Sequence, residues 1–317
     1  MPKLLSVALL LLLALPASAA AEETAPVPAI PDGGCTFGWT PGASVRITEK
    51  VDKGEGVALE QYTVTLAARD DGNFEVRYSD FVFLEFRGEK MTPELEKELA
   101  PVIALASAIP TVVVSPQGSV VGIEGFDAMI EGIEKVMVEK GATAEEAAMA
   151  AGMLRAPGVD TLLTSTVRGI WDIWVGDWVG FDLAPGASAD GEVPVDAANP
   201  EGAKQKLHVE NRGAADGHPG ALSFASTLTL DGEAGAAMMR PMFDGMMGGM
   251  APDERQKMEA VLAGLSASIV REGTVVTDPA TLRPVAATMT KTTVMQLAAM
   301  GMDQTKTETH EYTFDWK

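Results

Sequence analysis

The residues closest to chemistry are six methionines between Met238 and Met250. A thioether sulfur is a soft ligand that resists protonation, so a methionine cluster can bind Cu(I). Met238, Met242 and Met246 follow one another at intervals of four residues, which would place them on one face of a helix. Cu(I) binding through these three sulfurs is therefore one hypothesis. The other methionines of the run are Met239, Met247 and Met250.

Two further interpretations compete with copper binding. Pro241 and Gly245 would disturb a regular helix, and no histidine or cysteine lies nearby to strengthen a metal site. Methionine also fills irregular apolar space and adapts to different ligands, so the run, together with Phe243, could form a flexible hydrophobic lid. Ordinary core packing is the third interpretation and the favoured one.

Trp171, Trp174 and Trp178 cluster where a helical block meets the second set of expected strands. Such indoles can stack on a ligand, and the lid hypothesis assigns this role to Trp174 and Trp178. They can also seal the junction between two halves of the protein. Sealing is the favoured role.

The sequence contains no catalytic or cofactor motif. A Gly-x-Ser-x-Gly elbow, a phosphate-binding glycine-rich loop and a His-Glu-x-x-His zinc signature are all absent. His208, His218 and His310 are isolated and lack metal-ligand spacing. We therefore expect neither an enzyme nor a bound cofactor.

The first part of the chain predicts strands followed by helices. Apolar and polar residues alternate over 57–66 and 74–78, around a turn at 70–73, which predicts a hairpin. Residues 81–86 are expected to form either another strand or the same strand continued past a bulge at 79–80. A second hairpin is expected at 112–121. Helices are predicted over 92–108, 126–139, 144–155 and 158–170, with Thr143 and Glu146 as a capping box.

Strands are expected again near Val179, then over 206–210 and 222–230, before helical segments between 236 and 270. Further strands are predicted over 274–276, 284–296 and 304–316. The element order therefore repeats, which suggests two pseudo-repeated halves. The expected fold class is α+β, with a curved, half-barrel-like antiparallel sheet and covering helices.

The N-terminus predicts export. An apolar run over 4–15 follows Lys3 and precedes small residues over 17–21, as in a cleaved secretory signal peptide. The expected organisation is a signal peptide at 1–21, a flexible Pro/Ala-rich leader at 22–36, a first half at 37–172 and a second half at 173–317. Cys35 is the only cysteine, so no internal disulfide can form, and a free or buried thiol is expected.

The charge of the chain limits its partners. It carries 45 acidic and 24 basic residues, so nucleic acid is not an expected partner. Export points to a periplasmic or secreted protein. Its expected function is non-enzymatic binding of a lipid or another hydrophobic small molecule, as the lid hypothesis suggests. The alternatives are a structural or interaction protein of the cell envelope, which would contact an envelope protein, and the Cu(I) protein described above.

Two short motifs carry a resemblance. Ser-Pro-Gln-Gly-Ser-Val at 115–120 and Trp-Val-Gly-Asp-Trp at 174–178 resemble a pattern in uncharacterised secreted bacterial proteins of unknown function. At the level of fold, a curved antiparallel sheet covered by helices is similar to periplasmic lipoprotein and lipid carriers of the LolA and LppX kind. That resemblance implies a half-barrel that holds acyl chains under a helical lid, without covalent chemistry.

Overall fold

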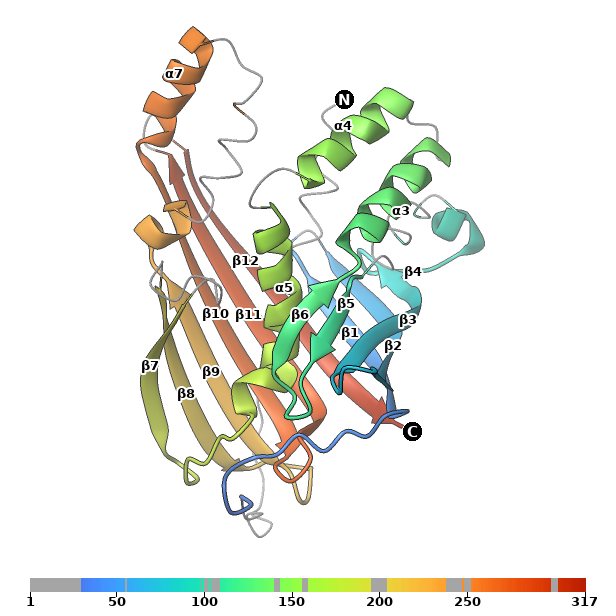
Figure 1. The fold of residues 1–317 in the computed structure, drawn as a ribbon, viewed down its shortest axis with the longest axis vertical. Coiled ribbons are helices and arrows are strands. Elements are labelled where there is room, and N and C mark those ends of the chain that lie inside the picture. The colour runs from blue at the N-terminus through green and yellow to red at the C-terminus, as the bar shows by residue number, and fades with distance from the viewer. Residues whose placement is uncertain are drawn as a thin grey trace.

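A single curved sheet of twelve antiparallel strands organises the molecule, which confirms the expected α+β class (Figure 1). The path through the sheet is β6-β5-β3-β2-β1-β12-β11-β10-β9-β8-β7, and the short β4 pairs with β3. The sheet does not close, and β6 and β7 form its two free edges. The computed structural model describes residues 30–54, 56–97, 99, 103, 109–139, 143–155, 159–194, 204–237, 247, 252–297 and 302–317.

The strands form a meander, because neighbours in sequence pair with each other on both sides of one junction. At that junction β1 pairs with β12, so the strands near the two chain ends lie side by side. In the first part of the chain the strands are β1 (Ser44–Asp52), β2 (Val57–Ala68), β3 (Phe74–Phe86), β4 (Glu89–Lys90), β5 (Thr111–Val114) and β6 (Val120–Glu124). In the second part they are β7 (Ser188–Pro194), β8 (Lys204–Ala214), β9 (Leu222–Leu230), β10 (Leu265–Asp278), β11 (Arg283–Leu297) and β12 (Met302–Trp316).

Alternating side chains give the sheet two different faces. On β12, Tyr312 and Phe314 are buried on the concave side, whereas Thr313 and Asp315 are exposed on the convex side. Threonines from neighbouring strands meet on the convex side, where the hydroxyl oxygens of Thr292 and Thr307 lie 3.2 Å apart. A period of two with β-branched residues on the outer face is what a half-buried strand requires.

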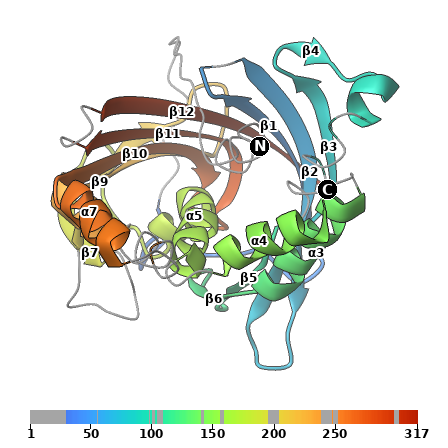
Figure 2. The ribbon, with the colours of Figure 1, turned by 90° about the horizontal axis from the view of Figure 1, so that it is seen from above.

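Helices lie on the concave side and at one rim of the sheet (Figure 2). The helix α5 (Val159–Trp174) runs inside the arc formed by the strands and contacts β6, β10 and β11. A single turn of 3₁₀ helix, η1 (Gly176–Trp178), follows it. Because α3 (Phe126–Glu139), α4 (Ala144–Leu154) and α5 connect β6 to β7, this helical block joins the two free edges.

Several local predictions are confirmed. The Thr143 hydroxyl accepts from the Glu146 backbone N–H at 3.2 Å, and the Glu146 carboxylate accepts from the Thr143 N–H at 2.9 Å, which is the expected capping box. The β2–β3 hairpin continues past a bulge at which Asp80 has a φ of 55°. The second hairpin, β5–β6, turns at 115–118 as expected.

Three predictions about element bounds were wrong. Val179 lies in the loop after η1 and belongs to no strand, because residues 176–178 turn in a 3₁₀ helix. The helical region expected up to residue 270 ends earlier: α7 (Pro252–Leu262) is followed by β10, which begins at Leu265. The strand β7 was missed, because its Asp, Gly and Pro residues have low strand propensity.

A segment before β1 closes one end of the sheet. Cys35 is buried, its backbone N–H donates to the Phe181 carbonyl at 2.9 Å, and its carbonyl accepts from Gly180 at 2.8 Å. The Gly38 N–H donates to the Thr281 carbonyl at 2.9 Å. The last part of the expected flexible leader, residues 30–36, is therefore fixed against the β10–β11 turn. The signal peptide at 1–21 lies outside the described residues.

The two expected halves share both the sheet and a helix. Their boundary at 172/173 falls inside α5, and the β1–β12 pairing joins them in one continuous sheet. Duplication stays a prediction. None of the helices in the described part of the chain is long and apolar enough to span a membrane.

Candidate ligand-binding face

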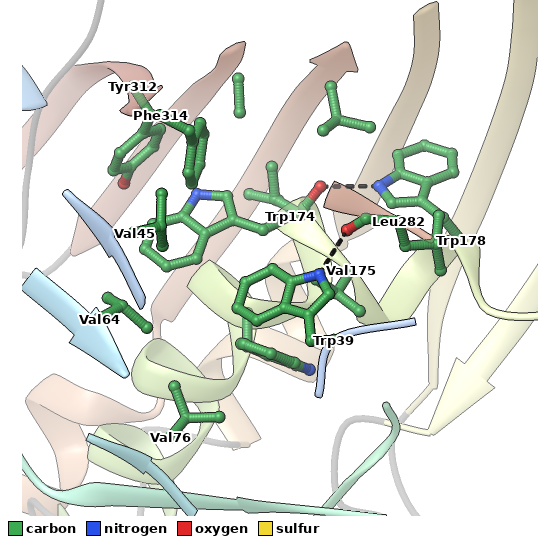
Figure 3. Close-up of a cluster of buried hydrophobic side chains, with 14 of the residues drawn as sticks. Trp39, Val45, Val64, Val76, Trp174, Val175, Trp178, Leu282, Tyr312 and Phe314 are labelled. Carbon is green, nitrogen blue, oxygen red and sulfur yellow. Dashed lines mark hydrogen bonds between the residues drawn. The ribbon is translucent and has the colours of Figure 1, made fainter. Parts of the chain in front are cut away.

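An aromatic plug fills the concave side of the sheet near its closed end (Figure 3). Its central member, Trp174 of α5, is fully buried, with ring centroids 5.2 Å from Tyr312 and 5.3 Å from Phe314. Trp171 and Trp178 are fully buried as well, and a role in sealing the junction between two halves stays a prediction. We define the aromatic plug as Trp39, Trp171, Trp174, Trp178, Tyr312 and Phe314.

Hydrogen bonds fix three of the four indoles of the plug. The Nε1 of Trp171 donates to the Gly118 carbonyl at 2.8 Å, and the Nε1 of Trp178 donates to the Ile173 carbonyl at 2.7 Å. The Nε1 of Trp39 donates to the Leu282 carbonyl at 3.0 Å. The buried Nε1 of Trp174 has no hydrogen-bond partner among the described residues. Packing alone therefore holds Trp174.

A band of ionisable side chains crosses the concave face next to the plug, on the side away from the closed end. We call it the polar belt. On β12 its members lie two to six residues from Tyr312, and on β10 its member lies four residues from Val275, all on the same face. Its members come from β1, β2, β10, β11, β12 and the residue after β1, and they are Glu49, Lys53, Glu60, Arg271, Lys291, Lys306, Glu308 and His310.

Glu49 is the centre of the acidic side of the polar belt. The carboxylate is 8% exposed, accepts a hydrogen bond from the Tyr62 hydroxyl at 2.9 Å, and pairs with Nδ1 of His310. Glu60 lies directly opposite on β2. Burial, followed by the nearby charge of Glu49, raises the pKa of Glu60 to about 8, although Lys53 opposes this shift. Glu60 therefore holds its proton at neutral pH.

The cationic side of the polar belt forms a row across three strands. Arg271 on β10 lies opposite Lys291 on β11, and Lys291 lies opposite Glu308 on β12. Lys306 follows two residues from Glu308 on the same face. Burial lowers the pKa of Lys291, and it also lowers the pKa of Lys53. Two like charges, those of Arg271 and Lys291, therefore lie side by side in this row.

Arg271 also connects the polar belt to α5. Its Nη1 donates to the Gly169 carbonyl at 3.0 Å, and its Nη2 lies 3.3 Å from a carboxylate oxygen of Asp177. Burial, followed by the charge of Asp177, raises the pKa of Asp172 to about 7. Arg168 partly offsets this shift, at 3.3 Å from Asp172.

Beyond the polar belt the concave face becomes apolar again. On β10 and β11, Ile269 and Met295 are partly exposed, whereas Ala267 and Leu297 are buried. The strands β11 and β12 are fifteen residues long, so they extend well past the plug toward the rim opposite the closed end. We call this rim the open rim and the side chains Ile269, Met295, Ala267 and Leu297 the upper apolar face.

The chain between β9 and β10 is described at its two ends, both near the open rim. It leaves β9 after Leu230, where the Asp231 carboxylate caps a helical turn by accepting from the Ala234 N–H at 2.9 Å. Gly235 in that turn lies so close to the Ala267 carbonyl that a Cβ atom would clash. The other end is α7, which leads into β10. We call residues 231–264 the connector, and it contains the methionine run.

The structure describes only part of the site predicted from sequence. Met247 is helical and 3% exposed, and its role as a packing or lid residue stays a prediction. Protein atoms cover both Trp174 and Trp178 completely, and a ligand contact through either ring stays a prediction. The remaining residues of the predicted lid and copper site lie outside the described residues: Met238, Met239, Met242, Phe243, Met246 and Met250.

Sequence reasoning missed the polar belt. His310 was interpreted as an isolated histidine, and Glu49, Glu60 and Lys291 were not singled out. The available signal was the parity of the strands: His310 shares its face with Tyr312 and Phe314, whose burial the aromatic pattern already implied.

Other candidate sites are weaker. In the described ranges, no group of three or more His, Cys, Asp or Glu side chains is placed to hold a metal ion. A polar depression of about 360 Å³ lies at the β7 edge, lined by Glu192, Lys204, Lys206, Thr229 and Asp231. Lys206 and Thr229 alternate with the inward-facing Leu207 and Leu228, so this depression is on the convex side.

Comparisons with known proteins give only distant structural similarity. No protein-family model matches the sequence, and no curated protein is similar to it, so the expected bacterial family finds no support. A solved structure described as showing lipid–protein interactions in lipovitellin is similar at 9% identity and a TM-score of 0.40. The similarity covers 87% of this chain and 25% of the lipovitellin chain. At that level it identifies neither a family nor a ligand.

Proposed function

We propose that the protein is a non-enzymatic binder of a hydrophobic or lipidic ligand in the periplasm or outside the cell. The upper apolar face supports this proposal most directly. One end of the curved sheet is filled by the aromatic plug, and the strands continue past the plug with apolar side chains that are partly exposed, such as Ile269 and Met295. An apolar concave surface with a few polar groups is typical of ligand sites.

The connector supports the same proposal. The connector has Gly235 packed against the Ala267 carbonyl near its start and α7 at its end. Its methionine-rich composition suits a cover that adapts to acyl chains of different shape. Export is supported by the apolar run at 4–15.

Binding of a fluorescent fatty-acid analogue tests this function. The wild-type protein should enhance the probe's fluorescence saturably. Ile269→Glu places a charge on the upper apolar face and should abolish the enhancement, because an acyl chain bound there would remove the carboxylate from water without a compensating partner. Val270→Glu is the matched control, since Val270 is the next residue on the same strand and lies on the opposite face. Equal binding by both variants, or no binding by the wild type, would contradict the proposal.

A further inference from the structure

The cations of the polar belt are arranged unfavourably, with like charges next to each other. Arg271 and Lys291 lie directly opposite each other on neighbouring strands, and like charges in that position destabilise a sheet. Burial lowers the pKa of Lys291, and the charge of Glu308 opposes this shift. The charges of Arg271 and Lys306 add to it, so one carboxylate stands against two cations. In a chain with 45 acidic and 24 basic residues, cations gathered on a concave face are unexpected.

Glu308 is the carboxylate that faces Lys291, directly opposite it on β12. The other carboxylates around the row are engaged elsewhere. Asp177 lies 3.3 Å from Arg271, and Glu49 binds Tyr62 and His310. Glu60 keeps its proton at neutral pH. Lys291 and Lys306 are both partly exposed. Departures from local rules of this kind are expected at functional sites.

We propose that Lys291 and Lys306, supported by Arg271, bind the anionic head group of an amphiphile, a carboxylate or a phosphate. This inference rests on the proposed function, since the tail of the amphiphile would occupy the upper apolar face. The head group lies next to the aromatic plug, and the tail points toward the open rim. Leu297 lies six positions beyond Lys291 on β11. This is roughly 20 Å of strand, a length that suits a long acyl chain.

In this proposal the amine nitrogens of Lys291 and Lys306 recognise the anionic head group. A charge-assisted hydrogen bond between an ammonium and a carboxylate or phosphate oxygen is stronger than a neutral one, and partial burial reduces competition by water. A neutral ester of the same chain offers no charge to these amines. The site therefore distinguishes an anionic amphiphile from its uncharged analogue.

Competition against the fluorescent fatty-acid analogue tests the head-group site. Palmitate should displace the probe at least roughly tenfold more strongly than methyl palmitate, the effect of losing one charge-assisted hydrogen bond. Lysophosphatidate should compete at least as well as the ester if phosphate is accepted. Acetate and inorganic phosphate should not compete, because they lack a tail.

Two lysine variants test which side chains bind the head group. Lys291→Gln should lose the preference for palmitate over its ester while retaining the ester. Lys306→Gln is the second variant, should Lys291→Gln fail to fold. Lys50→Gln is the control, since Lys50 on β1 faces the convex side and pairs with Glu311 at 3.1 Å.

The outcomes separate the two proposals. If palmitate and methyl palmitate compete equally with the wild type, or if both Gln variants keep the preference, the head-group site is wrong and the hydrophobic binding function stands. If acetate or inorganic phosphate competes as well as palmitate, the site binds free anions and the amphiphile inference is wrong. If the probe does not bind the wild type at all, the proposed function fails and the head-group site fails with it.

Discussion

Glu49 on β1 and Glu60 on β2 lie directly opposite each other on the concave face of the sheet. Two ionised carboxylates in that position would repel each other, and the surrounding groups resolve the conflict. Glu49 receives the hydrogen bond from Tyr62 and pairs with His310, whereas burial keeps Glu60 protonated. The two carboxyl groups therefore lie side by side with Glu60 protonated at neutral pH.

This relationship predicts how stability depends on pH. The pKa of Glu60 rises from its ordinary value of 4.5 to about 8 in the folded protein. Between these values the folded state binds more protons than the unfolded state, so Glu60 makes the free energy of unfolding fall as pH rises. Glu60→Gln cannot ionise. Above pH 8 the variant should exceed the wild type in stability by at least about 1 kcal/mol, the equivalent of one pKa unit.

Urea unfolding at pH 5 and pH 9 checks the prediction for Glu60. Glu311→Gln, on the convex face of β12, is the control, and its difference from wild type should change little between the two values. Parallel pH profiles for Glu60→Gln and the wild type would contradict the proposed protonation of Glu60.

The plug predicts unequal costs for two similar substitutions. Trp171→Phe removes the hydrogen bond to the Gly118 carbonyl, whereas Trp174→Phe removes none within the described structure. Both lose similar volume, so Trp171→Phe should destabilise the protein by about 1 kcal/mol more than Trp174→Phe. Midpoints of urea unfolding measure the difference. Equal losses would show that the Trp171 hydrogen bond contributes no net stability.

The connector contact predicts a matched effect of two glycine substitutions. Gly235→Ala forces a Cβ atom against the Ala267 carbonyl and should release the start of the connector from β10. Gly152→Ala, in α4, meets open space and should leave stability unchanged or raise it by up to about 1 kcal/mol. Limited proteolysis should cut the connector faster in Gly235→Ala alone. Equal cleavage rates would argue against the tether.

The buried thiol predicts low reactivity. Burial, followed by the charge of Asp278, raises the pKa of Cys35 to about 12, so little thiolate exists at neutral pH. Iodoacetamide at pH 8 should modify Cys35 in the unfolded protein and spare it in the native one, as mass spectrometry can measure. Rapid labelling of the native protein would mean that the segment at 30–43 opens readily.

Local patterns predicted most of the elements, whereas long-range pairing lay beyond them. Alternation and turn residues indicated β2, β3, β11 and β12, and the capping box at Thr143 placed α4. The pairing of β1 with β12 depends on residues more than 250 positions apart, which no local pattern contains. The polar belt exists only after that pairing brings Glu49 next to His310.

The central claim is tested most directly by native mass spectrometry, with lipid extraction, on the mature protein purified from its native host. We expect wild-type protein to carry an acyl species at near-stoichiometric occupancy and Ile269→Glu to lose it, while Val270→Glu retains it. A bare polypeptide mass for the wild type, under conditions that preserve the complex of a known lipid carrier, would contradict the claim.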